Sequence, residues 1–367
     1  MPNARVARRL AAVELMTKAA SVSAVVTYHE SPETIRRVLD ALLQQDYALE
    51  QIVIVDNGSR QGLDHLASTR ARVSAIRLPA GTGLSRARNV GLAKVESEFA
   101  LVLDDDIYLA PDCLNRMMAA ALETGASAVC PRIVFHPEDA VIQCDGASIH
   151  FAGMLALNNK DASISGMPGS RHRCGAFIGA CVLFNRQLLT GLGGFDEDYY
   201  FYFEDLELSY RLRAHGHEIW CEPNGVVFHD RGRGTPELSF RGQGRYPAQR
   251  AYFNLRHRWM TMLLHYQVRT LAALLPALAL YDLASLTECI RRGFLAQWFE
   301  AARSVLRMLP QVQTKRARWQ AERTVADREI LSGGPLPFAA GLLEGRTATR
   351  MAHLLGALMQ LNWSLTR

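Results

Sequence analysis

Residues 22–135 alternate short runs of β-branched residues with segments of helical periodicity, and few folds accommodate that alternation. After the first run, at 22–28, apolar residues recur at the spacing of an amphipathic helix: Ile35, Val38, Leu39, Leu42 and Leu43. Further strands are predicted at 52–55, 73–78 and 99–103, and helices at 61–69, at 84–95 and from Pro111. Repeated strand–helix–strand units predict a parallel, doubly wound sheet whose binding site lies at the carboxyl ends of its strands.

Three of the predicted strands end in polar residues. The strand at 22–28 ends in Thr27-Tyr28 and is followed by His29-Glu30. The strand at 52–55 runs into Asp56-Asn57-Gly58-Ser59, and the strand at 99–103 runs into Asp104-Asp105-Asp106. We expect these residues to converge, as a nucleotide cleft requires. Three adjacent carboxylates repel one another and are costly to desolvate, so the aspartates indicate either a bound cation or a solvated turn.

A second acidic pair, Glu204-Asp205, precedes the amphipathic segment 206–212 and is expected in the first turn of a helix. A carboxylate placed there can accept a proton from an attacking hydroxyl group. The alternative is ordinary charge matching, because acidic side chains are favourable at the positive end of a helix dipole.

The composition indicates a globular intracellular protein. The 367 residues are 49% hydrophobic, which excludes wholesale disorder. Seven cysteines are scattered without a CxxC pair, which argues against a disulfide framework or a zinc site and suits a reducing cytoplasm. Residues 1–20 are basic, but Arg8, Arg9, Glu14 and Lys18 interrupt any apolar core, so we expect no signal peptide.

The C-terminal third is both basic and apolar. Residues 251–367 carry 15 Lys and Arg against 7 Asp and Glu, whereas the rest of the chain carries 26 against 29. The apolar stretch 271–286 contains Pro276 and Asp282 and falls short of a clean membrane-spanning helix. These features predict either helices that lie on an anionic membrane surface or a soluble helical subdomain with a charged face.

Two segments are predicted to be loops. Residues 155–173 are polar and contain glycine, so we expect a mobile loop there. Residues 230–250 are expected to form either a solvated basic loop or a lid that orders on phosphate, for which arginine is well suited. Five arginines support this second reading: Arg231, Arg233, Arg241, Arg245 and Arg250. From about Tyr252 the pattern is helical, with breaks near Pro310 and Gly333.

Seven short motifs in a fixed order resemble those of the inverting, GT-A-fold glycosyltransferases of family 2, especially the bacterial rhamnosyltransferase and galactofuranosyltransferase-like members. The motifs cover residues 22 to about 258. They are Val25-Val26-Thr27-Tyr28, Val55-Asp56-Asn57-Gly58-Ser59, Gly83-Leu84-Ser85-Arg86-Ala87-Arg88-Asn89-Val90-Gly91, Leu103-Asp104-Asp105-Asp106, Gly193-Gly194-Phe195-Asp196-Glu197, Phe203-Glu204-Asp205-Leu206-Glu207-Leu208 and Val227-Phe228-His229.

The resemblance implies an α/β fold of the GT-A type, which is a Rossmann-like, doubly wound and mostly parallel sheet, followed by a helical C-terminal region. It divides the chain into a basic N-terminal segment (1–21), a GT-A domain (22–258) and a helical, basic region associated with a membrane surface (259–367).

The resemblance also implies a nucleotide-sugar site. Asp56 would accept a hydrogen bond from the nucleobase, beside Thr27 and Tyr28, although Asp-Asn-Gly is also a common turn sequence. Asp104 would face the ribose, with Asp105 next to it. Gly179, in the small-residue segment 174–181, would lie under the donor sugar.

The segment 81–91 would also lie against the nucleotide. Gly83 and the following helix would bring backbone N–H groups and cations close to it, with Arg86, Arg88 and Asn89 in supporting roles. The alternative is that Arg88 or Asn89 only braces the three aspartates.

For catalysis, the resemblance implies a divalent metal bound by Asp106, Asp104 and His229, and a general base at Asp205. Mixed carboxylate and imidazole ligands favour Mn²⁺ over Mg²⁺ in affinity, although Mg²⁺ is the other candidate. Glu204 and Glu207 are second choices for catalysis, positioning or acceptor binding.

The sequence thus predicts a metal-dependent inverting glycosyltransferase. Its donor would be dTDP-rhamnose or a UDP-sugar, and its acceptor a glycan or polyprenyl-linked glycan in cell-surface polysaccharide synthesis. We expect the protein to be cytoplasmic and peripheral at the inner face of the cell membrane.

Three alternatives remain. A non-catalytic membrane-surface scaffold would keep the same fold. A sugar nucleotidyltransferase would need a Gly- and Lys-rich loop after the first strand, and His29-Glu30-Ser31-Pro32 supplies none. Nucleic-acid binding is disfavoured because aromatic residues are not interleaved with the basic ones.

Overall fold

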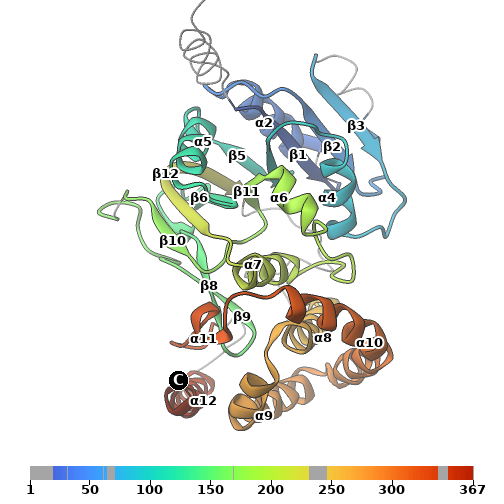
Figure 1. Ribbon diagram of the computed structural model, residues 1–367, viewed down its shortest axis with the longest axis vertical. Helices are drawn as coiled ribbons and strands as arrows, with labels where there is room; N and C mark the ends of the chain where they lie inside the picture. The colour runs from blue at the N-terminus through green and yellow to red at the C-terminus, as the bar shows by residue number, and fades with distance from the viewer. Residues whose placement is uncertain are drawn as a thin grey trace, which may run out of the picture.

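The computed structural model describes residues 20–30, 32–60, 62–63, 71–167, 169–230, 246–337 and 346–366. Three layers of helix and sheet occupy one end of the molecule and a group of helices occupies the other (Figure 1). Three predicted features lie outside the described residues, wholly or in large part: the basic segment 1–21, the helix at 61–69, and the loop with Arg231, Arg233, Arg241 and Arg245.

The central sheet is mixed, and its strands are ordered β10-β12-β6-β11-β4-β1-β2-β3. The predicted strands are present as β1 (Val22–Tyr28), β2 (Ile52–Asp56), β3 (Val73–Arg77) and β4 (Phe99–Asp104), which all run parallel. The remaining strands are β6 (Ala128–His136), β10 (His172–Cys174), β11 (Cys181–Asn185) and β12 (Ile219–Asp230), with β5 (Ile107–Leu109) paired to β12 and β7 (Ile142–Cys144) paired to β6.

Helices cover both faces of this sheet, which confirms the doubly wound architecture. Successive strand residues point to opposite faces. Val26 packs with Ile35 of α2 (Pro32–Leu43) on the face that α5 (Cys113–Thr124) also covers. Val25 packs with Ala87 of α4 (Leu84–Leu92) on the other face, where α6 (Arg186–Gly191) and α7 (Glu204–Ala214) lie.

A small second sheet joins the two ends of the molecule. β8 (Ala147–His150) pairs antiparallel with β9 (Met154–Leu157) and parallel with β13 (Leu331–Ser332), which comes from the far end of the sequence. The segment predicted as a loop, 155–173, therefore has strand residues at both of its ends, in β9 and in β10.

The C-terminal region is helical, as predicted, with α8 (Ala248–His265), α9 (Val268–Arg292), α10 (Leu295–Glu322), α11 (Asp327–Ile330) and α12 (Arg346–Thr366). The break predicted near Pro310 is wrong, because α10 continues through it. α8 passes through residue 258, where the sequence analysis divides the chain, so the division at 258 stays a prediction.

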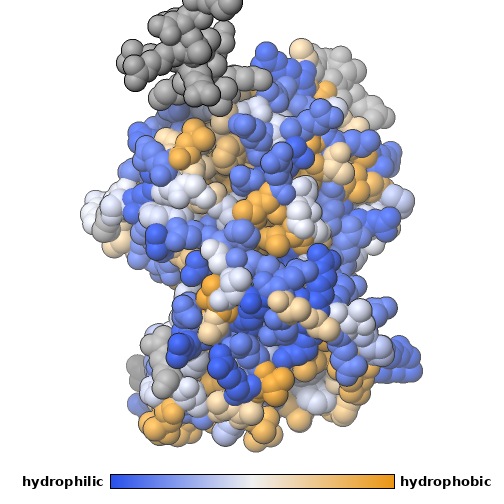
Figure 2. Space-filling model, viewed as in Figure 1, coloured by the Kyte–Doolittle hydropathy of each residue, from blue (hydrophilic) through white to orange (hydrophobic). Residues whose placement is uncertain are grey.

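One helix in the described part of the chain, α9, is long and apolar enough to cross a membrane when judged by length and composition alone. Only 17% of its most apolar stretch is buried in the fold. Such a helix is weak evidence for a membrane span. Hydrophobic residues gather at the lower end of the molecule, over α9 and α12 (Figure 2).

Candidate active site

The carboxyl ends of β1, β2 and β4 meet, as the strand pattern predicts. The Thr27 hydroxyl donates to Asp104 Oδ1 at 3.1 Å, and the His29 N–H donates to Asp105 Oδ2 at 2.8 Å. Tyr28 stands opposite Asp56 in the β1–β2 register. The three polar segments found in the sequence therefore form one edge of the sheet.

At this edge, two predicted nucleotide contacts are buried. The side chain of Tyr28 is 2% exposed and packs in the hydrophobic core, so only its backbone can face the cleft. Asp56 is 1% exposed and accepts from the Ser59 N–H at 2.8 Å and the Ser59 hydroxyl at 2.9 Å. In this state Asp56 closes its own turn, which is the alternative that the sequence left open.

Arg88 is the centre of the acidic site. It is 1% exposed, and its Nη2 donates to Asp104 Oδ1 at 2.9 Å and to the Gly179 carbonyl at 2.8 Å. Nη1 donates to Glu204 Oε1 at 2.9 Å. Burial opposes the charge on Arg88, but Asp104 and Glu204 outweigh it and raise its pKa. Arg88 therefore braces the carboxylates, and its guanidinium is not free to face a nucleotide.

Glu204 and Asp205 begin α7 and face this arginine. Burial and the neighbouring Asp205 raise the pKa of Glu204 to about 7, although Arg88 lowers it. The pKa values of both partners are raised, which favours the charged form of Arg88 but the neutral form of Glu204, because burial and Asp205 outweigh the arginine at Glu204. Glu204 consequently contributes stability below its ordinary pKa of 4.5, and that contribution is lost as pH rises to about 7.

Asp205 is more open to solvent than Glu204. Its Oδ2 accepts from the Gly179 N–H at 3.1 Å, and its Oδ1 accepts from its neighbour's N–H, that of Leu206, at 2.7 Å. Burial raises the pKa of Asp205, and the hydrogen bonds from these two N–H groups partly offset that rise. A carboxylate that is oriented by backbone donors and has a raised pKa is suited to accept a proton.

The turn before α7 has an uncommon backbone. Tyr202 and Phe203 both have a φ of 69°, a left-handed conformation that costs non-glycine residues about 1–3 kcal/mol each. His257 of α8 donates from Nδ1 to the Tyr202 carbonyl at 2.8 Å. Burial lowers the pKa of His257 to about 3, so the ring stays neutral. α8 thus holds the turn that presents Glu204 and Asp205.

The segment 81–91 contacts protein where a nucleotide contact was predicted. A Cβ at Gly83 would lie 2.7 Å from the ring of Tyr200, and the Leu84 N–H donates to the Tyr200 carbonyl at 2.8 Å. Asn89 accepts from the Phe195 N–H and donates to its carbonyl, each at 2.8 Å. The start of α4 is therefore occupied by the loop before α7. Arg88 contacts Asp104, as the bracing alternative predicts, whereas Asn89 binds the backbone of Phe195 in that loop.

Arg86 is placed differently from the rest of this segment. Its side chain is 64% exposed, and its Nε lies 4.0 Å from Glu197 Oε2. Among the basic residues of α4, Arg86 is thus the one with a side chain open to solvent.

The predicted metal ligands divide into a pair and a separate carboxylate. His229 Nε2 lies 3.5 Å from Asp106 Oδ2, and its Nδ1 is 2.7 Å from Gln143 Oε1. Asp104 is held instead by Arg88 and Thr27. Within the described residues, no three His, Cys, Asp or Glu side chains gather closely enough to hold a metal ion alone. Two side chains do suffice where substrate phosphates and waters supply the other ligands, as is usual for Mg²⁺.

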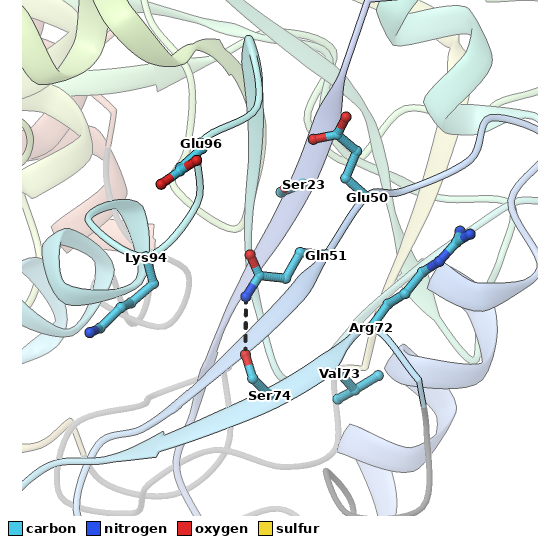
Figure 3. A pocket seen from close by; sticks show the side chains of 8 residues that line it. All are labelled: Ser23, Glu50, Gln51, Arg72, Val73, Ser74, Lys94 and Glu96. Carbon is cyan, nitrogen blue, oxygen red and sulfur yellow. Dashed lines mark hydrogen bonds between the residues drawn. The ribbon is translucent and has the colours of Figure 1, made fainter.

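A hollow of about 550 Å³ lies elsewhere, lined by residues that include Ser23, Gln51, Ser74 and Lys94 (Figure 3). Ser23, Gln51 and Ser74 stand at the amino-terminal ends of β1, β2 and β3. Because open α/β sheets bind ligands at the carboxyl ends of their strands, this hollow is not the donor site.

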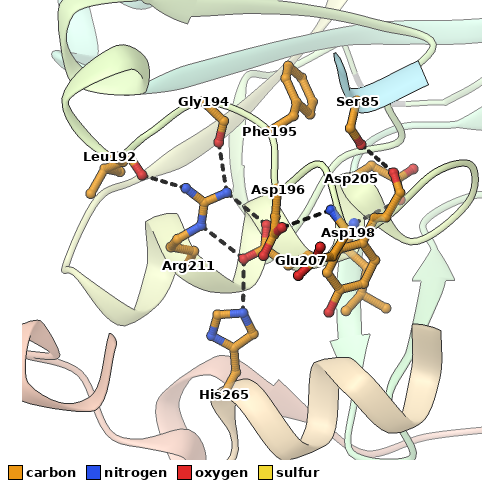
Figure 4. A network of polar contacts seen from close by, with 12 residues as sticks. Ser85, Leu192, Gly194, Phe195, Asp196, Asp198, Asp205, Glu207, Arg211 and His265 are labelled. Carbon is orange, nitrogen blue, oxygen red and sulfur yellow. Dashed lines mark hydrogen bonds and ion pairs between the residues drawn. The ribbon is translucent and has the colours of Figure 1, made fainter. Parts of the chain in front are cut away.

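Below the acidic pair, α7 is fixed by a buried network (Figure 4). Arg211 donates to Glu207 at 2.9 and 2.7 Å and to the carbonyls of Leu192 and Gly194. His265 of α8 lies 2.9 Å from the same carboxylate. Burial opposes ionisation of Glu207, but Arg211 and His265 outweigh it and lower its pKa to about 2. Glu207 is thus a structural ion, not an acceptor-binding residue.

Comparison with known proteins identifies the domain. Residues 23–190 match the family model described as Glycosyl transferase family 2. The chain carries a family 2 glycosyltransferase domain. This match runs from β1 into α6, so the α7 carboxylates and His229 lie beyond it. Inversion at the anomeric carbon is typical of family 2.

Two curated relatives of this domain are named as transferases from Mycobacterium tuberculosis. The chain is 24% identical to the pre-mycofactocin glycosyltransferase, over 57% of this chain and 42% of the relative. It is 24% identical to N-acetylglucosaminyl-diphospho-decaprenol L-rhamnosyltransferase, over 57% of this chain and 76% of the relative. The match to a protein from Sinorhizobium fredii covers 28% of that protein's length. The chain therefore spans less than half the length of several relatives that it matches.

The fold has a counterpart among solved structures. GalNAc-T7, determined with UDP, GalNAc and Mn²⁺, aligns with a TM-score of 0.54 and 16% identity, covering 71% of this chain and 51% of that one. This likeness confirms the GT-A fold of the family 2 domain.

Sequence reasoning missed two features of the site. Gln143, which orients His229, lies in a short strand with no recognisable motif, and only the β6–β7 pairing brings it close. The strained pair Tyr202 and Phe203 has no glycine to signal a positive φ. Asn57, which the sequence analysis names only as part of the turn after β2, has an Oδ1 that is buried without a partner among the described residues.

Proposed function

We propose that this protein transfers a sugar from a nucleoside-diphosphate donor to a hydroxyl group of a glycan or lipid-linked glycan, with inversion of the anomeric carbon. The observation that carries the proposal is the guanidinium of Arg88, which binds Asp104 and Glu204 at 2.9 Å each. It joins the carboxylates at the end of β4 to the start of α7, where Asp205 stands. Donor and acceptor would meet between these two groups.

In this mechanism Asp205 is the general base. It accepts the proton of the acceptor hydroxyl as that oxygen attacks the anomeric carbon on the side opposite the leaving nucleoside diphosphate. The N–H groups of Gly179 and Leu206 hold the carboxylate in place. Glu204 stays on Arg88 and positions the base without touching substrate.

Asp106 and His229 would hold a divalent cation together with the donor's phosphate oxygens. The cation would neutralise charge that develops on the leaving diphosphate. The fit rests on the 3.5 Å approach of His229 Nε2 to Asp106 and on Gln143, which fixes the other ring nitrogen. The Mn²⁺ of the GalNAc-T7 structure supports the same choice of ion.

A dTDP- or UDP-sugar is the proposed donor. Support comes from the rhamnosyltransferase relative and from the UDP in the GalNAc-T7 structure. The decaprenol-linked acceptor in that relative's name supports a lipid-linked glycan as the acceptor. We further propose that the protein acts in cell-surface polysaccharide synthesis at the cytoplasmic face of the membrane.

The test is donor turnover. Purified protein is incubated with a panel of dTDP- and UDP-sugars and Mn²⁺, with and without a chelator, and the released nucleoside diphosphate is measured. We expect one donor to give chelator-sensitive release. Asp205→Asn should lower turnover by about 10²–10⁴-fold, the range for loss of a general base. Asp106→Asn should abolish the response to Mn²⁺.

A non-catalytic scaffold is the competing function, and calorimetry distinguishes it from a transferase that waits for its acceptor. Titration with dTDP and with UDP in the presence of Mn²⁺ should show binding that Asp106→Asn weakens. Absence of metal-dependent binding of either nucleotide would overturn the transferase and favour the scaffold.

A further inference from the structure

Large apolar side chains are exposed mainly at one end of the molecule. Among the described residues, 14 such side chains are exposed, and 12 of them lie on α9, α10 and α12. The other two, Leu43 and Leu122, lie beside the central sheet. Contiguous apolar surface on a soluble protein marks an interaction site, whereas scattered apolar residues need no explanation.

On α12 the exposed residues form a continuous stripe. They recur every three or four positions and are 48–77% exposed: Met351, Leu354, Leu358, Leu361 and Leu365. The opposite face of α12 is fixed, because Met359 and Trp363 are buried and the Trp363 ring stacks on Phe151 at 5.1 Å. The stripe is therefore presented by an anchored helix.

α9 adds a second stripe next to the first. Val268, Leu275, Leu283 and Ile290 are 57–71% exposed, and Asn362 of α12 donates to the Ala273 carbonyl of α9 at 3.3 Å. Figure 2 shows the resulting hydrophobic surface at the lower end of the molecule.

The charges around these helices are mostly positive. The exposed charged side chains described on α9, α10 and α12 are two glutamates, Glu300 and Glu322, and six arginines: Arg269, Arg291, Arg303, Arg307, Arg318 and Arg350. Arginine binds phosphate oxygens well. A second copy of this chain would instead bring one set of arginines against another.

We propose that the exposed face of α9, α10 and α12 docks on the surface of an anionic lipid bilayer. Its leucines would enter the boundary between head groups and acyl chains, and its arginines would contact lipid phosphates.

The contacts of α9 favour docking over insertion. Asp282, in the middle of α9, accepts from Arg258 at 2.6 Å and from the Trp259 indole N–H at 3.0 Å. These α8 residues clamp α9 to the folded protein. A spanning α9 would have to break this ion pair and take Asp282 into the membrane, which is costly.

This docking would serve the proposed function, on which its biological meaning rests. α8 lies between α9 and α7 (Figure 1). Its His257 also holds the turn before Glu204 and Asp205. α8 thus connects the proposed membrane-facing helices to α7, which carries the proposed base. A lipid-linked acceptor would need to reach that base from the membrane.

Sedimentation of the full chain with lipid vesicles tests the inference. Vesicles of phosphatidylcholine alone are compared with vesicles that also contain phosphatidylglycerol. We expect binding to the second kind, weakened by salt because the lipid charge is screened. Leu354→Gln with Leu361→Gln should weaken binding about tenfold or more, since two exposed leucines lose their burial in lipid. Leu43→Gln with Leu122→Gln is the matched control and should bind as the parent does.

A second variant tests the charge. Arg303→Gln with Arg307→Gln should weaken binding to the anionic vesicles by about fivefold for each arginine. Binding to phosphatidylcholine vesicles should change little.

Equal binding by the leucine variant and its control would overturn the inference. So would a dimer in light scattering that the leucine variant converts to monomer without any vesicle binding, since a second copy would then cover this face. None of these measurements needs sugar transfer, so a failure here is distinguishable from failure of the proposed function.

Discussion

Arg88 and Glu204 form a buried ion pair, with Nη1 of the arginine 2.9 Å from Oε1 of the glutamate. The pair joins the helix after β3 to the helix that carries the proposed base. Because the same guanidinium also binds Asp104, a single residue sets the spacing between the two acidic groups of the site.

Arg88→Met is therefore expected to be strongly destabilising. Removing one partner of a buried ion pair leaves the other charge without compensation, which costs about 3–5 kcal/mol. Urea denaturation of the variant should show a correspondingly lower free energy of unfolding.

Arg86→Met is the matched control for that variant, since Arg86 lies on the same helix but is 64% exposed. Its effect should stay within about 0.5 kcal/mol, as for most surface substitutions. If both variants lost the same stability, the bracing role of Arg88 would be wrong.

A second prediction concerns acid. Arg211 and His265 outweigh burial and lower the pKa of Glu207 from 4.5 to about 2. A group with a depressed folded-state pKa stabilises the protein above its unfolded value, and this stability is lost as pH falls. The contribution of Glu207 should thus be complete above pH 4.5 and should decline towards pH 2.

Glu207→Gln should remove this part of the acid sensitivity and should cost about 3–5 kcal/mol at neutral pH, because Arg211 is left buried without its carboxylate. Unfolding free energies of parent and variant, measured across that pH range, check the sign. A difference between them that does not shrink as pH falls would contradict the assignment.

A third prediction concerns Gln143, which orients the His229 ring and does not itself bind the metal. Gln143 accepts the hydrogen bond that fixes the His229 ring, with Oε1 and Nδ1 2.7 Å apart. Loss of such a partner usually costs about 10–100-fold in metal affinity or activity. Gln143→Leu should therefore raise the Mn²⁺ concentration needed for nucleotide binding by that factor. Gln44→Leu, at an exposed residue directly after the end of α2, is the control. An unchanged Mn²⁺ requirement would rule out this role.

The fold followed from local patterns in the sequence. β1, β2, β3 and β4 are apolar runs, and their helices show clear periodicity, so each could be found without tertiary information. Proline was misleading at residue 310, because the packing of α10 on the rest of the bundle outweighs a local helix-breaking tendency.

The site was harder to predict from the sequence. The sequence identifies which polar residues lie at strand ends, but it does not show which partners each of them hydrogen-bonds. Asn89 and Gly83 belong to a motif that resembles a nucleotide contact, yet both pack against the loop before α7. Such pairings join residues more than a hundred positions apart, and no local pattern encodes them.

The fourth prediction uses two glycines with different surroundings. At Gly179 a Cβ would lie 2.7 Å from Arg88 Nη1, and Arg88 has little freedom to move because it is buried and bound to two carboxylates. Gly179→Ala should cost about 1–3 kcal/mol, the usual penalty for overpacking. A Cβ at Gly191, at the end of α6, would meet nothing within 4 Å. Gly191→Ala should be neutral or stabilising by up to about 1 kcal/mol.

Both alanine variants are compared by urea denaturation and by calorimetric binding of UDP with Mn²⁺. Gly179→Ala should weaken nucleotide binding as well as stability, because Arg88 can clear the new methyl group only by moving away from Asp104. Gly191→Ala should leave binding unchanged. Equal stability of the two variants would mean that the Arg88 side chain can move at little cost. It would contradict the claim that Arg88 fixes the spacing between Asp104 and the start of α7.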